Sequence, residues 1–186
     1  MKAVTVKELK QELDIRTSKE LRELCLRLAR FKKENKELLT YLLFELSDEE
    51  SYVESVKKEI DQQFEQVNKK TYYLIKKGLR RILLNIRKYI RYSQKKQTEV
   101  DLLIYFCAKL KKFTPSIQRN TRLLSIYNGQ IEAIRKKVSC LHEDLQFDYE
   151  SELNALNEKH HLTSNELHNS NHGNKTVPLS RFSQTR

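Results

Sequence analysis

Turn-forming residues are almost missing from this sequence, which has only 3 glycines and 2 prolines among 186 residues. An average chain has glycine at about 7% and proline at about 5% of its positions. Sandwiches, barrels and doubly wound α/β folds need these residues for their turns. Charged residues make up 33% and apolar residues 38% of the chain, which is typical of long amphipathic helices that face solvent. The sequence therefore predicts an all-α protein, either a multi-helix bundle or a short α-solenoid with long antiparallel helices.

Helix-start signals divide the first part of the chain. Three stretches have this form: Thr5-x-x-Glu8, Thr17-x-x-Glu20 and Ser47-x-x-Glu50. The first two have the form of a capping box, in which the threonine and glutamate side chains satisfy free backbone amides at the start of the helix. We expect a short helix over residues 5–13. The polar residues 32–35 favour two helices rather than one within residues 17–46.

The middle of the chain contains fewer residues that interrupt or end a helix. A break near Asn68 would divide residues 47–92 into two helices of about 18 and 24 residues, and without it the segment is one long helix. The polar residues 93–98 predict a loop. Residues 100–113 predict a short apolar helix that stops before Pro115, because the residue preceding a proline is pushed out of helical geometry.

The most regular apolar pattern comes next, with alternating steps of three and four residues. Its members are Leu124, Tyr127, Ile131, Ile134, Val138, Leu141 and Leu145. This spacing is typical of a coiled coil or a helical hairpin. Two interpretations stay open, an internal pair of helices in one bundle and a seam for a second chain, which would give a homo-oligomer through Leu124–Leu145.

These elements predict one helical domain over residues 3–160. Its expected parts are N-terminal helices over 3–46, a long basic-faced helical segment over 47–92 and a helical hairpin over 97–160. Residues 161–186 are rich in Asn, Ser, Thr and His. They cannot bury enough apolar surface to offset the entropy of ordering, so we expect a disordered tail.

The cysteines indicate a reducing compartment. Cys25, Cys107 and Cys140 are an odd number without a C-x-x-C pattern, which argues against a disulfide framework and a structural zinc site. Cys25 and Cys107 have apolar neighbours, so we expect them to be small buried hydrophobic residues. No signal-peptide pattern opens the sequence, and no apolar run approaches the ~20 residues of a membrane span. We expect a cytoplasmic protein without a membrane span.

Positive charge is concentrated in the middle third of the chain. The formal net charge is +11, and residues 66–131 carry 16 basic side chains against two acidic ones, Glu99 and Asp101. On a continuous helix with about 100° per residue, ten bases within residues 66–98 share an arc of roughly 140°, opposite an apolar arc. These ten candidate polyanion-binding residues are Lys69, Lys70, Lys76, Lys77, Arg80, Arg81, Arg87, Lys88, Arg91 and Lys95.

A single sign of charge along a helix is unusual. Solvated faces usually mix signs, because like charges four residues apart repel by a few tenths of a kcal/mol. The pattern favours an external polyanion. Two other interpretations stay open: the bases have no role, or acids of the same chain neutralise them, such as Asp48, Glu49, Glu50, Glu54, Asp61 and Glu65. Nucleic acid is the favoured partner, bound through its phosphates with little base discrimination, and acidic proteins are the other candidates. Tyr73 and Tyr92 could stack on unpaired bases.

Patterns for catalysis are missing. The glycines are isolated, so no phosphate-cradling loop is expected, and no H-E-x-x-H or G-x-S-x-G motif occurs. We therefore expect no catalytic residue, no metal site and no cofactor. The sequence predicts a non-catalytic helical protein that binds a polyanion through a basic helix face. The alternative is an adaptor or scaffold that acts through coiled-coil contacts with other proteins.

Overall fold

The computed structural model describes residues 2–166, with side chains for residues 2–156. Over the described residues the chain forms eight α-helices, a π-helical turn and a 3₁₀ turn, and it has no strand. The prediction of an all-α protein is confirmed. The chain divides into two compact units between Leu141 and His142, and a single domain over residues 3–160 stays a prediction.

The second unit begins with one helix, α8 (Glu143–Glu166). This helix continues past residue 161, where the tail was expected to begin. The rest of the predicted tail, residues 167–186, lies outside the described residues.

The N-terminal elements are α1 (Val6–Asp14), α2 (Ser18–Phe31), α3 (Lys33–Thr40) and a π-helical turn (Tyr41–Glu45). Both predicted capping boxes form, at Thr5 before α1 and at Thr17 before α2. The boundary between α2 and α3 is a single extended residue, Lys32. Residues 17–46 therefore contain two helices rather than one, as expected.

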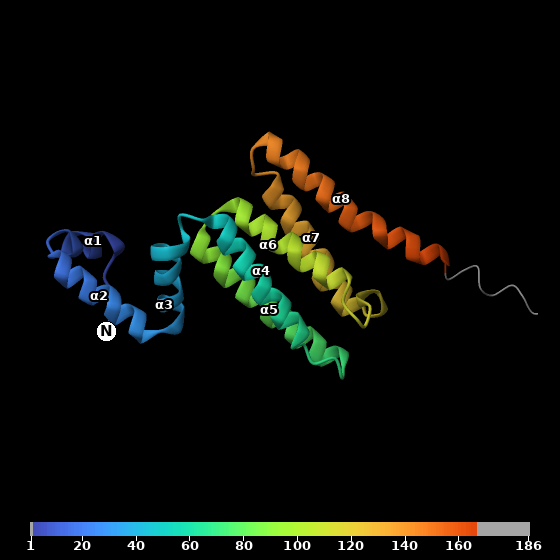
Figure 1. Cartoon of the computed structure of the whole chain (residues 1–186), viewed down its shortest axis with the longest axis horizontal. Helices are drawn as coiled ribbons and strands as arrows, with labels where there is room; N and C mark the ends of the chain where they lie inside the picture. The colour runs from blue at the N-terminus through green and yellow to red at the C-terminus, as the bar shows by residue number, and fades with distance from the viewer. Residues whose placement is uncertain (1, 167–186) are drawn as a thin grey trace, which may run out of the picture. The chain divides into compact units, whose positions relative to one another are not determined.

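The core of the first unit is built by α4 (Glu49–Glu65), α5 (Tyr72–Ser93), α6 (Lys96–Lys111) and α7 (Thr121–Val138). These long helices lie side by side, and α6 packs against the other three (Figure 1). A gap between α4 and α5 decides between the two alternatives left open near Asn68, because the chain forms two helices there rather than one. A 3₁₀ turn, Ile117–Arg119, connects α6 to α7.

Two helix boundaries differ from the expected ones. Asp48, rather than Ser47, caps α4, and its carboxylate accepts a hydrogen bond from the N–H of Ser51 at 3.0 Å. The loop expected over residues 93–98 is reduced to two residues between α5 and α6. Gln94 makes this short connection because it adopts the left-handed conformation, with φ of 57°, and so reverses the chain at once.

The most enclosed helix is α6, which the sequence predicts as a short apolar helix. Five of its side chains have no exposed surface: Val100, Leu102, Phe106, Cys107 and Leu110. The ring of Phe64 on α4 lies 5.5 Å from that of Phe106. Each apolar side chain buried in this way contributes about 1.5–3 kcal/mol to folding. The core therefore lies around α6 and leaves the outer face of α5 uncovered.

The apolar seam expected from Leu124 to Leu145 is not continuous on one helix, because α7 ends at Val138. Leu123, which is fully buried, takes the place of the partly exposed Leu124 at its start. Four members of the seam have at most 4% exposed surface: Tyr127, Ile131, Ile134 and Val138. Since α7 packs along α6, this part of the seam belongs to the core.

The three cysteines differ in exposure. Cys107 is buried as expected, and burial raises the pKa of its thiol to about 12. Cys25 is exposed, so its predicted burial is wrong: no residue of α2 is buried within the described part of the chain. Cys140 is also exposed.

This difference predicts the thiol reactivity of the folded protein. In the single chain, a disulfide-exchange reagent at about pH 8 should react quickly with Cys25 and Cys140, because only accessible thiolates are nucleophiles. Cys107 should react only after unfolding, which the absorbance of the released thiol would show with and without denaturant. Cys107→Ser should leave the fast phase unchanged, and a third fast thiol in the native protein would contradict the packing around α6.

Candidate anion-binding surface

The candidate surface is on α5, where local sequence signals set both the start of the helix and its orientation. The Thr71 hydroxyl accepts a hydrogen bond from the N–H of Leu74 at 3.2 Å and caps the first turn. The apolar stripe that fixes the helix on the core has at most 6% exposed surface and consists of Ile75, Leu79, Ile82, Leu83 and Ile86. The basic side chains on the other side of this helix therefore project away from the core.

The basic stripe is shorter than the sequence predicts. Lys69 and Lys70 precede α5 and Lys95 follows it, so one helical wheel does not apply to all ten bases. The 22 residues of α5 span about 33 Å at a rise of 1.5 Å per residue. The ammonium of Lys69 lies 4.9 Å from the ring centroid of Phe113 in a cation–π contact.

Two of the ten bases are neutralised by this chain. The Lys88 ammonium lies 2.6 Å from a carboxylate oxygen of Glu37 on α3, and the Lys95 ammonium lies 3.0 Å from one of Glu49. Asp61, another acid considered for this role, instead pairs with Lys109 on α6. Internal neutralisation therefore accounts for two bases in the C-terminal part of the stripe, where it approaches α3 and α4.

The Glu37 carboxylate holds α3 against α5. Burial opposes its ionisation, but hydrogen bonds from Lys88 and Tyr92 outweigh burial and lower the pKa of Glu37. Lys33 adds a longer ion pair of 3.6 Å. Lys88 is thus occupied by a structural contact, which removes it from the set of bases that are open to a ligand.

Seven of the ten bases make neither an ion pair nor a cation–π contact with any side chain that the structure describes: Lys70, Lys76, Lys77, Arg80, Arg81, Arg87 and Arg91. Lys76 is partly exposed and the other six are exposed. We call Arg80, Arg87 and Arg91 the arginine row. They share an arc of about 40° and span about 17 Å along α5.

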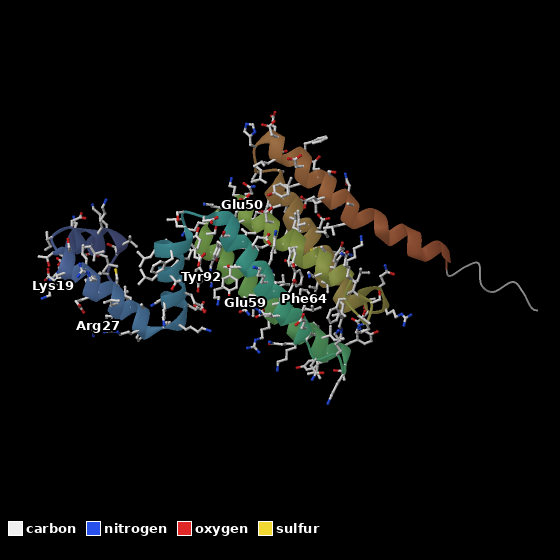
Figure 2. All side chains as sticks on the ribbon, viewed as in Figure 1. Lys19, Arg27, Glu50, Glu59, Phe64 and Tyr92 are labelled. Atoms are coloured by element: carbon white, nitrogen blue, oxygen red, sulfur yellow. The ribbon has the colours of Figure 1, made fainter. Side chains whose placement is uncertain are left out.

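The two tyrosines proposed for stacking have different surroundings. Tyr73 is 72% exposed at the beginning of α5, on the same side as the arginine row. Tyr92 is only 8% exposed, and its hydroxyl donates to Glu37 at 3.1 Å. In Figure 2 it lies between α3 and α5. Of these two tyrosines, only Tyr73 has a ring exposed enough to stack on a nucleobase.

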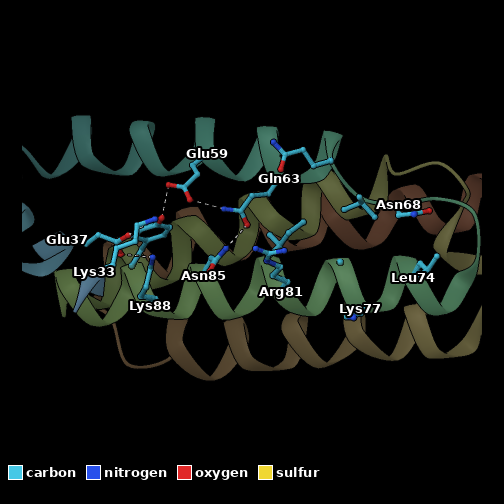
Figure 3. A pocket seen from close by; sticks show the side chains of 15 residues that line it. Lys33, Glu37, Glu59, Gln63, Asn68, Leu74, Lys77, Arg81, Asn85 and Lys88 are labelled. Atoms are coloured by element: carbon cyan, nitrogen blue, oxygen red, sulfur yellow. Dashed lines mark hydrogen bonds and ion pairs between the residues drawn. The ribbon is translucent and has the colours of Figure 1, made fainter. Parts of the chain in front are cut away.

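A polar cleft of about 520 Å³ borders the basic face, between α3, α4 and α5 (Figure 3). Hydrogen bonds cross it from Tyr89 to Glu59 at 2.6 Å and from Asn85 to Gln63 at 3.0 Å. The cleft also extends past Arg81 and Lys77, a turn or more further toward the start of α5. One half is therefore closed by internal hydrogen bonds, while the other is lined by two bases.

Sequence reasoning missed three parts of this surface. The partner of Lys88, Glu37, is 51 residues away, so no local spacing indicates their contact. The amide pair of Gln63 and Asn85 carries no pattern of its own. Leu84 could have been found from the helical wheel, because its position falls among the bases, where it is 64% exposed.

Comparisons with known proteins give no further guide. No protein-family model matches the chain, and no match appears among curated proteins or solved structures. Among the described residues, no group of three or more His, Cys, Asp or Glu side chains could hold a metal ion. No helix in that part of the chain combines the length and apolar character needed to cross a membrane.

Proposed function

We propose that this protein binds a polyanion, with nucleic acid favoured, through the exposed bases of α5. The observation that carries the proposal is the arginine row, whose three guanidinium groups have no carboxylate partner among the described residues. Lys77 and Arg81 extend the same positive surface to the edge of the polar cleft. No catalytic step is part of this proposal.

The chemistry of these groups supports phosphate as the ligand. Guanidinium groups have a fixed fork of donors that matches phosphate oxygens, and they stay charged at any physiological pH. A row about 17 Å long spans two to three backbone phosphates, since B-DNA phosphates repeat every ~3.4 Å of axis per strand and only some face one side. Because such contacts read no base edges, we expect weak sequence preference.

A titration at two salt concentrations tests this function. Fluorescence anisotropy of labelled RNA and duplex DNA of about 20 nucleotides should report an association constant whose logarithm falls linearly with the logarithm of salt concentration. The expected slope is about −3 to −4.5 for four to five phosphate contacts, those of the arginine row together with Lys77 and Arg81. Absence of binding at about 50 mM salt would exclude the proposal. Binding that does not weaken with salt would exclude the phosphate contacts.

A second candidate function is an adaptor or scaffold that acts through helix–helix contacts. The apolar seam of α7 gives it little support, because its central members are buried in the core. The observation in its favour lies elsewhere, in α1 and α2, whose apolar side chains are exposed. An apolar helix pair would form with little dependence on salt, which separates this candidate from polyanion binding.

A further inference from the structure

Apolar side chains remain exposed along α1 and α2, although both helices are amphipathic. Neither helix has a buried residue in the part of the chain that the structure describes. The exposed fraction is 41% or more for each of Val6, Leu9, Leu13, Leu24, Leu28 and Phe31. In a folded protein, so many exposed apolar side chains on neighbouring elements mark an interaction surface.

These two helices border an apolar cleft of about 900 Å³ with a charged rim. Its apolar part is formed by Leu9 and Leu13 of α1 and Leu24 of α2. The rim of α2 has acids in its first half, Glu20 and Glu23, and bases in its second half, Arg27 and Arg30. Arg27 is labelled on α2 in Figure 2, together with Lys19 near the start of the helix.

The charges on this rim differ in whether the chain already pairs them. Glu20 belongs to the capping box of Thr17 and lies 3.7 Å from a guanidinium nitrogen of Arg16. Glu23, Arg27 and Arg30 are exposed and form no ion pair with another described side chain. An occupant of the cleft would therefore meet open charges of both signs, in a fixed order along α2.

We propose that a second copy of this chain covers the apolar face of α1 and α2, with the two α2 helices antiparallel. Two antiparallel α2 helices that cross beside Cys25 place Glu23 level with Arg27 of the second copy, and Glu20 level with Arg30. Because a two-fold interface repeats each contact, four opposite-charge pairs flank the apolar stripes. Lys19, the one base that the first half of α2 places on the rim, falls level with the uncharged Phe31.

The charge order also excludes the other simple arrangements. A parallel pair in register would bring Glu23 against Glu23 and Arg27 against Arg27, and like charges across a helix pair are unfavourable. Helices that lie on anionic lipid have a basic polar face and usually Trp at the boundary. The polar residues of α1 instead include Glu8, Glu12 and Asp14, and the chain has no Trp.

Charge reversal on the full-length protein tests this interface, with molar mass from light scattering and sedimentation at about 50 mM salt. We expect a dimer, and we expect Glu23→Arg and Arg27→Glu each to raise the dimer dissociation constant at least about tenfold. An equimolar mixture of these two variants should associate again, because one chain then carries two bases and the other two acids at the paired positions. If each substitution only destabilised its own α2 helix, mixing the two variants could not restore association.

Two further variants separate the interface from folding. Arg22→Glu changes an exposed arginine on the opposite side of α2 and should leave the dimer unchanged. Leu28→Lys should dissociate the dimer without loss of helical circular dichroism, since Leu28 is 59% exposed in the single chain. A monomer at every concentration, dissociation by Arg22→Glu, or no recovery in the mixture would overturn the proposal. A monomer that sediments with phosphatidylglycerol vesicles would also overturn it and make lipid the occupant.

Discussion

Glu49→Gln should lower the free energy of unfolding by about 3 kcal/mol, more than a typical exposed substitution of this protein. The Glu49 carboxylate accepts hydrogen bonds from the hydroxyls of Tyr41 at 2.8 Å, Thr98 at 2.5 Å and Ser93. Its fourth partner is the Lys95 ammonium at 3.0 Å. The amide has one acceptor oxygen in place of two, so buried donors lose their partner at the junction of α4, α5 and α6.

Acidification should reproduce the effect of this variant. Burial opposes ionisation of Glu49, but the hydrogen bonds from Ser93, Thr98, Lys95 and Tyr41 outweigh it and lower the pKa below its ordinary value of 4.5. The native state therefore binds this proton less readily than the unfolded chain. The stabilisation is complete above the ordinary pKa and is lost as the pH falls through the lowered one.

Urea unfolding of both proteins at several pH values measures these two effects. The difference in free energy of unfolding between wild type and Glu49→Gln should be largest near neutral pH and shrink below about pH 4.5. Glu50→Gln is the matched control, because Glu50 is the next residue of the same helix and is exposed. Equal losses for the two variants would show that the four hydrogen bonds of Glu49 do not hold the junction together.

The sequence predicts well the features of this fold that depend on neighbouring residues. The capping boxes at Thr5 and Thr17 form because both partners lie within one helical turn. The buried face of α5 follows the helical period because Ile75, Leu79 and Ile86 contrast with bases on the other side. Near Asn68 the sequence is compatible with both a break and one long helix, since polar residues permit a turn without requiring it.

Contacts between distant elements could not be predicted in this way. The four partners of Glu49 come from the π-helical turn, the end of α5, the connection that follows it and α6, and nothing near Glu49 in the sequence indicates them. The predicted arc of ten bases assumes one continuous helix from Lys69 to Lys95, whereas α5 begins after Lys69 and ends before Lys95. Cys25 shows a related limit. The amphipathic pattern of α2 indicates that one face of this helix packs against something, but it does not indicate against which molecule.

Replacing Arg80, Arg87 and Arg91 together by alanine should weaken binding of RNA or DNA by about a hundredfold or more at about 50 mM salt. The three exposed side chains form no ion pair with a described residue, so their removal should not disturb the fold. Each lost phosphate contact reduces the salt slope by about 0.7–0.9. We therefore expect the slope of the triple variant to be shallower by about 2 to 3.

A control with the same net charge distinguishes this surface from general attraction by a basic protein. Arg119, Arg122 and Lys136 are three exposed bases that lie outside α5, and their replacement by alanine removes equal charge. If the guanidinium groups of α5 contact phosphates, the control should retain most of its affinity and a slope near that of the wild type. Equal weakening of both triple variants would mean that the polyanion responds only to the total charge, and that the arginine row is not its binding site.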